Sequence, residues 1–99
     1  MIYTCENEHY IRPENPNPQK IIAAAVLQNG RLWCGDRHWH LMHEAYNFSG
    51  ERVTQDQQGF LTDDFLFVRR RAAMFIAELG GQVSEEDAKH PYLLSEYLW

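Results

Sequence analysis

The chain has 99 residues, a formal net charge of −5, 44% hydrophobic residues and 13% aromatic residues. This length predicts one domain, and the acidic balance argues against general DNA or RNA binding, which depends on many cationic contacts to phosphates. No apolar run approaches the roughly 20 residues that span a bilayer, which argues against a membrane protein. So much apolar surface in so short a chain predicts burial between subunits, and we expect a homo-oligomer.

Residues 1–19 are expected to form an N-terminal arm. Pro13, Pro16 and Pro18 disfavour helix there, and the expected regular structure is a short strand at residues 2–4. The segment has no basic region followed by an apolar stretch, so we do not expect a secretory signal. Because the two cysteines form no framework of closely spaced pairs, a reducing compartment is favoured, and we expect a cytoplasmic protein.

Residues 20–50 are predicted to form a hairpin followed by a helix. Apolar runs on either side of Asn29-Gly30 are typical of a β-hairpin over residues 20–35, since both turn residues tolerate a positive φ. The apolar spacing over residues 37–48 predicts a helix, with Asp36 as its N-cap and Ser49-Gly50 as its end. Residues 51–58 are polar and are expected to form a loop.

The second half repeats this plan. We expect a hairpin over residues 59–68 with its turn at Asp63-Asp64, then a helix over residues 70–79 that ends at Gly80-Gly81. Residues 84–87 are expected to be a solvated loop, and the apolar residues 92–99 a terminal strand or a contact with a neighbouring subunit. Residues 20–99 therefore predict a single α+β domain: a small, mostly antiparallel sheet of two hairpins plus a terminal strand, with two helices.

The junction before the first helix is one candidate site. A helix N-terminus presents free N–H groups and the positive end of the macrodipole, which suits an anion. Arg37 adds a forked cation and His38 or His40 a donor, while Trp39 could stack on a base. A structural interpretation, with Trp39 in the core and Arg37 solvated, stays open.

Three arginines at the start of the second helix form the other candidate. Cations at this end of a helix oppose the macrodipole, and phosphate binding would explain Arg69, Arg70 and Arg71 there. The alternative is a solvated start in which one arginine pairs with a nearby acid, Asp63, Asp64 or Glu78. Basic residues gather in the middle of the chain, which favours one confined anion site over a nucleic-acid track.

Metal binding and catalysis find less support in the sequence. Cys34, His38, His40 and His43 lie close together, but their spacing matches no closed zinc pattern, so we expect no metal and no cofactor. Cys34 beside a histidine could form a nucleophile pair, and a histidine beside Glu44 could exchange protons. No hydrolase motif accompanies them, and we expect a protein that is not an enzyme.

Several ordered blocks resemble a widespread family of short phage proteins. They are residues 20–25 (KIIAAA), 37–38 (RH), 59–62 (GFLT), 67–68 (FV) with Arg70 and Ala73, 81–82 (GQ), 94–96 (LSE) and 98–99 (LW). We identify this family as similar to the phage Thoeris anti-defence sponges of the first type. The resemblance implies an oligomer that sequesters the cyclic ADP-ribose-type signal of bacterial Thoeris immunity in the host cell, and in some members cyclic oligonucleotides, without cleavage.

The resemblance also implies which residues contact the ligand. The matching positions are Arg37, His38, Phe60, Thr62 and Arg70, to which the residue analysis adds Trp39, His40 and Arg69. The chain departs from the family pattern at Phe65-Leu66, where a Gly-Arg turn is expected, and at Arg69, where an acid is expected. Both departures bear on the second turn, its charge and the choice of ligand.

Two other functions stay open. One is an acidic protein–protein inhibitor of a host defence complex, similar in action to an anti-CRISPR, that would use Glu85, Glu86 and Asp87. The other is a small hydrolase of nucleotide signals that would use His38 or His40. The sequence favours the first function: a phage protein that binds a small anionic nucleotide and holds it unchanged.

Overall fold

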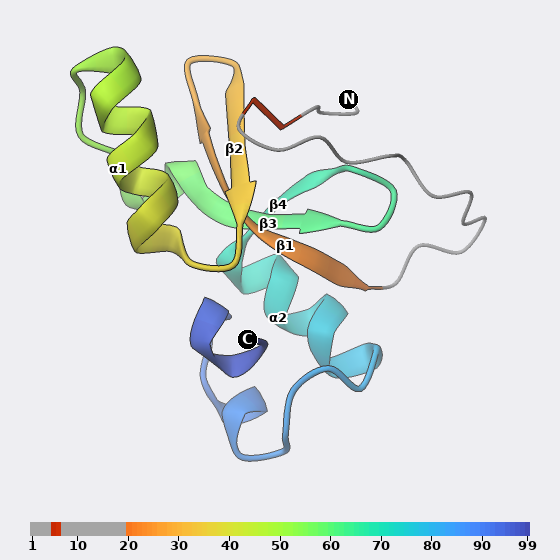
Figure 1. The fold of residues 1–99 in the computed structure, drawn as a ribbon. Coiled ribbons are helices and arrows are strands. Elements are labelled where there is room, and N and C mark those ends of the chain that lie inside the picture. Colours follow the sequence, from red (N-terminus) through yellow and green to blue (C-terminus); the bar gives the residue numbers. More distant parts are fainter. Residues whose placement is uncertain (1–4, 7–19) are drawn as a thin grey trace.

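The computed structural model describes residues 5–6 and 20–99, which form a four-stranded antiparallel sheet with two α-helices (Figure 1). The strand order is β2-β1-β3-β4. The strands and α-helices are β1 (Ile21–Gln28), β2 (Arg31–Gly35), α1 (His38–Ser49), β3 (Gln58–Thr62), β4 (Phe67–Arg69) and α2 (Arg70–Leu79). The predicted α+β class is confirmed, while the strand expected at residues 2–4 lies outside the described residues.

The first hairpin forms as its turn residues predict. Asn29 and Gly30 have φ values of 52° and 79°, the left-handed region that a two-residue hairpin turn requires. The strands pair from Gln28 opposite Arg31 to Ala24 opposite Gly35.

The second hairpin turn is longer than the sequence predicts. Residues 63–66 connect β3 to β4, rather than Asp63-Asp64 alone. Phe65 has a φ of 63° although it is not glycine, and its side chain is buried. Burial of a large aromatic ring offsets the cost of this backbone conformation. This stabilisation comes from tertiary packing, so the turn preferences of the local sequence do not predict it.

The structure corrects the beginning of α1. Arg37, not Asp36, occupies the N-cap position, and its side chain makes no capping hydrogen bond. The Asp36 cap is wrong because that residue lies one position too early, with its side chain exposed. The end is as predicted, since Gly50 follows Ser49 with a left-handed φ of 74°.

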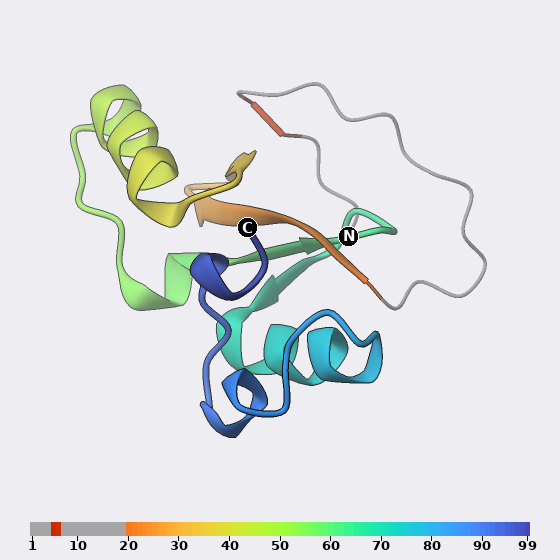
Figure 2. The ribbon, with the colours of Figure 1, turned by 60° about the horizontal axis from the view of Figure 1, so that its bottom comes forward.

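The expected terminal strand is also wrong. Within the described residues, the chain after Tyr92 adds no strand to the sheet and instead forms a short 3-10 helix at Ser95–Tyr97. Two more short 3-10 helices lie at Gln55–Gln57 and Asp87–Lys89. Figure 2 shows the C-terminal segment between α1 and α2. Its Leu93, Tyr97 and Leu98 belong to or pack against the apolar cluster to which both helices contribute. Leu93 is fully buried there, and its N–H donates to the carbonyl of Arg70 at 3.0 Å.

Alternate residues of β1 supply two apolar clusters on opposite faces of the sheet, as the pleat dictates. Both helices pack on one face, where the cluster includes Ala24, Val26, Leu41, Ala45, Phe60, Ala73, Met74, Ala77 and Leu93. The other face holds Cys5, Ala23, Ala25, Leu32, Cys34, Leu61 and Phe65. The alanines of β1 are fully or almost fully buried, because their small side chains let neighbouring elements approach closely.

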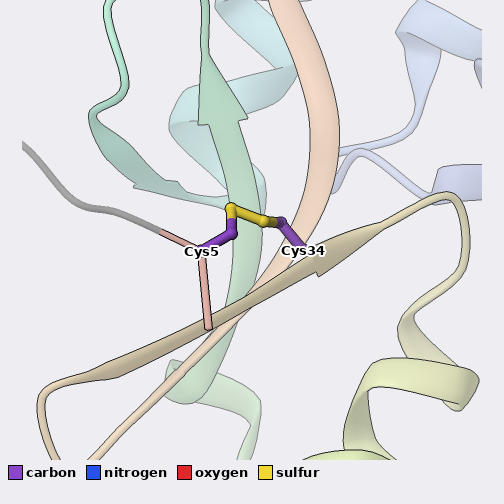
Figure 3. Close-up of a disulfide and its surroundings, with 2 residues drawn as sticks. All are labelled: Cys5 and Cys34. Atoms are coloured by element: carbon purple, nitrogen blue, oxygen red, sulfur yellow. A yellow bond between two sulfur atoms is a disulfide. The ribbon is translucent and has the colours of Figure 1, made fainter. Parts of the chain in front are cut away.

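A disulfide joins the N-terminal segment to β2. Cys5 and Cys34 are bonded, with their Cα atoms 5.7 Å apart and a sequence separation of 29 (Figure 3). Their wide spacing gave no sign of this pairing in the sequence. The cytoplasmic location expected from the cysteines stays a prediction. Among the described residues, no helix is long and apolar enough to cross a membrane.

Candidate functional site

The starts of both helices meet at Gly59 in β3. The Nε2–H of His38 donates to the Gly59 carbonyl at 2.6 Å, and Gly59 pairs across the sheet with Arg69, the residue before α2. A Cβ on Gly59 would lie 2.2 Å from the Val68 carbonyl oxygen and 2.6 Å from the Phe67 ring. Glycine at this position therefore allows β4 to approach β3 closely, next to the points where both helices begin.

The surroundings of His38 are typical of a residue that stabilises the fold. Its ring is buried and meets the ring of Phe60 edge-on, with centroids 4.9 Å apart. Burial lowers the pKa of His38 below its ordinary value of 6.5; the Gly59 hydrogen bond opposes this, Arg70 lowers the pKa further and Glu96 raises it. The neutral ring with a proton on Nε2 fits this environment, because a carbonyl oxygen needs a donor.

Arg37 holds the C-terminal segment. Its guanidinium donates to the carbonyl oxygens of Ser95, at 3.5 Å, and of Trp99. The Trp99 ring stacks on Phe60 at 6.5 Å between centroids. The sequence predicts that a ligand phosphate binds this guanidinium. In the structure, carbonyl oxygens of the same chain bind it instead.

Phe60 and Thr62 lie in the interior. Phe60 is fully buried, and Thr62 is 5% exposed. The Thr62 hydroxyl contacts the Asp64 carboxylate and accepts from the Leu66 N–H at 3.1 Å, which holds the second turn. Neither side chain presents a surface to a ligand in this arrangement, and their role in binding stays a prediction.

The start of α2 is open. A cavity of about 230 Å³, here called the arginine pocket, is lined by Gln55, Asp56, Gln58, Arg69, Arg70, Arg71 and Tyr92. The guanidinium of Arg70 lies over the Tyr92 ring, 5.6 Å from its centroid. In the part of the chain that the structure describes, no carboxylate forms a salt bridge with any of the three arginines. The suggested pairing with Asp63, Asp64 or Glu78 is therefore not seen.

Several residues of this pocket are not predicted from the sequence. The sequence predicts a terminal strand at Tyr92 and a polar loop at Gln55 and Gln58. No local pattern marks them, because the fold brings them to the arginines from other segments. Arg71 belongs to the predicted arginine candidate at the start of the second helix, but not to the residues predicted to contact the ligand.

Trp39 and His40 lie elsewhere, on the exposed side of α1. Trp39 is 70% exposed, so the alternative that placed it in the core is wrong. It lines the α1 cavity, of about 550 Å³, with Met42, His43, Tyr46, Arg52 and Val53. His40 stacks on Trp39 and lies 3.3 Å from the Glu44 carboxylate. The two cavities have no lining residue in common.

Cys34 offers neither a nucleophile nor a metal ligand, because its sulfur is fully buried and bonded to Cys5. The Cys34–histidine pair that the sequence left open is therefore not formed while the disulfide is intact. Over residues 5–6 and 20–99, no group of three or more His, Cys, Asp or Glu side chains could hold a metal ion.

The family described as phage T4 y16D protein matches residues 20–99. No curated protein and no solved structure matches the chain.

Proposed function

The chain belongs to the phage T4 y16D protein family, and we propose that it binds and sequesters a cyclic nucleotide immune signal without cleaving it. The ligand class is a cyclic ADP-ribose isomer or a cyclic oligonucleotide, as the resemblance to the Thoeris anti-defence sponges implies. The observation that carries the proposal is the arginine pocket at the start of α2.

Charge is the first support for an anionic ligand. Arg69, Arg70 and Arg71 stand at the positive end of α2, and no described carboxylate forms a salt bridge with them. Their mutual repulsion and the helix macrodipole both disfavour this arrangement without an anion. A phosphate accepts forked, charge-assisted hydrogen bonds from arginine, so a bound phosphate relieves both effects at once.

The remaining lining suits the uncharged parts of a nucleotide. Tyr92 is 51% exposed, and a base stacked on such a ring contributes about 1–3 kcal/mol. The amides of Gln55 and Gln58 can donate to or accept from ribose hydroxyls and base edges. With about 1.5–3 kcal/mol for each hydrogen bond to a charged group, these contacts suffice for tight binding.

The size of the pocket limits how much of a ligand it can enclose. At about 230 Å³, the cavity is smaller than the roughly 300–1,000 Å³ of most ligand sites. It can take a phosphate with part of its ribose, and the rest of the ligand extends beyond it. In the homo-oligomer that we propose, a second copy of the chain would cover that part.

The pocket chemistry favours holding the ligand over hydrolysing it. Of the described residues that line it, Asp56 is the one carboxylate, and histidine and cysteine do not contribute. His38, one of the suggested hydrolytic histidines, is buried against Gly59. A water molecule at a phosphate in this pocket therefore lacks a histidine base within the described lining.

The proposal is tested by a thermal shift measured with cyclic ADP-ribose isomers, cyclic di- and trinucleotides, NAD and ADP-ribose. Each stabilising mixture is then boiled, and the released ligand is analysed by chromatography. We expect a concentration-dependent rise in Tm with a cyclic species that is recovered intact. An altered ligand would show an enzyme, and the lack of any shift would redirect attention to the acidic loop and a protein partner.

A matched pair of variants locates the site. Arg70→Ala removes a cation from the arginine pocket, and Arg52→Ala removes one from the α1 cavity. We expect only the first to reduce the thermal shift markedly. The reverse result would move the binding site to the α1 cavity.

A further inference from the structure

The described non-covalent contacts between residues 5–6 and β2 are weak. Cys5 forms an isolated parallel bridge with Leu32, and the Glu6 N–H donates to the Leu32 carbonyl at 2.6 Å. The Glu6 carboxylate lies 3.4 Å from the Arg31 guanidinium, with 40% and 47% of the two side chains exposed. An ion pair this exposed adds little, and one bridge does not offset the entropy of ordering a chain segment. Among these described contacts, the covalent bond is the strongest link.

The sulfur atoms lie within the apolar cluster on the sheet face opposite the helices. Cys34 is fully buried and Cys5 is 6% exposed, among Ala23, Ala25, Leu32, Leu61 and Phe65. A thiol reduces a disulfide only by direct attack on a sulfur atom, so access controls the rate. The bond is therefore protected while the segment stays in place and becomes vulnerable when the segment opens.

The position of the bond gives it a local effect. β2 is at the edge of the sheet, and residues 5–6 contact it along that outer edge (Figure 3). β1, β3 and β4 pair with one another without using this segment. Breaking the bond can thus free the segment while the rest of the sheet stays paired.

We propose that the Cys5–Cys34 disulfide is a reversible latch that holds residues 5–6 on β2, and that reduction by thiols of the glutathione or dithiol class releases them. A reductant thiolate attacks one sulfur and displaces the other cysteine as a thiolate. A second reductant thiol then resolves the mixed disulfide. The two cysteines gain two electrons and two protons, and the reductant becomes a disulfide. This inference does not rest on the proposed nucleotide site.

The released state has two new surfaces. The outer edge of β2 loses its hydrogen-bonded cover at Leu32, and the cluster around Leu61 and Phe65 loses the side chain of Cys5. An uncovered strand edge and an apolar patch are both surfaces to which other chains add. The latch therefore makes the exposure of the β2 edge and of this apolar cluster depend on whether the surrounding solution is reducing.

The test compares the full chain before and after dithiothreitol, by intact mass, hydrogen exchange and native alkylation with iodoacetamide. Reduction should add two hydrogens, speed exchange of the Glu6 amide by about tenfold or more and leave β1 and β3 protected. Cys5 should be alkylated at least about tenfold faster than Cys34 because only Cys5 leaves the interior. Loss of the cross-link should lower Tm by roughly 10 °C.

Two variants keep the test decisive. Cys5→Ala should behave like the reduced protein and no longer respond to dithiothreitol, whereas Glu6→Gln should keep the bond and behave like the oxidised protein. Two free thiols in the air-oxidised protein, or unchanged exchange at Glu6 after reduction, would overturn the latch. Loss of protection throughout the sheet would also overturn it, since the bond would then hold the whole fold.

Discussion

The starts of α1 and α2 have similar local sequences and backbone conformations but different tertiary contacts. Each helix is preceded by an arginine in extended conformation, Arg37 or Arg69, and neither arginine makes a side-chain capping hydrogen bond. At α1, Arg37 donates to carbonyls of Ser95 and Trp99. At α2, Arg69 lines an open pocket with two more arginines. Similar local chemistry therefore makes a structural clamp at one helix and a candidate anion site at the other.

The C-terminal segment makes the difference. It passes between the two helices (Figure 2) and supplies backbone carbonyls to the guanidinium of Arg37. At the other helix it contributes Tyr92, whose ring lies beneath Arg70 without neutralising it. The comparison shows that an arginine before a helix indicates an anion site only when no other part of the chain already satisfies its donors.

Gly59→Ala should have the largest effect, because the residue lies where β4 approaches β3 closely and its carbonyl accepts the His38 hydrogen bond. The new Cβ would lie 2.2 Å from a backbone oxygen, and a strand cannot move locally by that much. We expect a loss of about 3 kcal/mol or more in the free energy of unfolding, measured by urea denaturation. A loss below about 1 kcal/mol would show that β3 and β4 can move apart at this position at little cost.

Arg70→Ala should weaken ligand binding at the start of α2, where the pocket is open. Losing one charge-assisted contact of about 1.5–3 kcal/mol predicts an affinity roughly 10- to 100-fold weaker for the cyclic nucleotide found by thermal shift. Stability should change little, since the side chain is only half-buried and makes one cation–π contact. Titration calorimetry gives the affinity, and urea denaturation of the same variant gives the control. An affinity within twofold of the original would remove this arginine from the site.

Arg37→Ala should loosen the C-terminal segment at the start of α1, where Arg37 holds it. It removes the donor that holds Ser95 and Trp99, so we expect the unfolding free energy to fall by about 1–2 kcal/mol. Amides of the C-terminal segment should exchange faster, while ligand affinity should change less than in Arg70→Ala. The sequence alone predicts loss of binding in both variants. Loss of binding in Arg37→Ala at unchanged stability would favour that view over the clamp.

The smallest effect expected is the pH dependence that His38 contributes. Its pKa is lowered by burial, so below its ordinary pKa the unfolded chain binds more protons than the folded one. Stability should therefore fall as pH drops below about 6.5 and level off above it, with a slope of at most about 1.4 kcal/mol per pH unit. His38→Gln should flatten this part of the profile measured by urea denaturation. An unchanged profile would assign the dependence to other groups.

The sequence predicts the elements whose structure is decided by neighbouring residues along the chain. The Asn29-Gly30 turn, the end of α1 at Gly50 and the span of α2 follow from backbone preference and apolar spacing. Prediction from the sequence fails at the second turn, where burial of Phe65 outweighs local preference, and at the C-terminal segment, which packs between helices instead of pairing as a strand.

The candidate site divides in the same way. The cluster of arginines before α2 was visible in the sequence, as was the aromatic and basic character of residues 37–40. That Trp39 faces a separate cavity, that His38 is buried and that Tyr92 joins Arg70 depend on contacts between distant segments. Residue type shows which chemistry is available, but exposure and competing partners decide whether a ligand can use it.

The sequence by itself determined the α+β class, the first hairpin, both helices and the presence of arginines suited to an anion. Those features arise from φ preferences and periodicity, which act over a few residues. The tertiary structure alone decided the Cys5–Cys34 bond, the clamp at Arg37 and the open pocket at Arg70. Each of these needs two segments far apart in the chain, and only the packing of the apolar core brings such segments together.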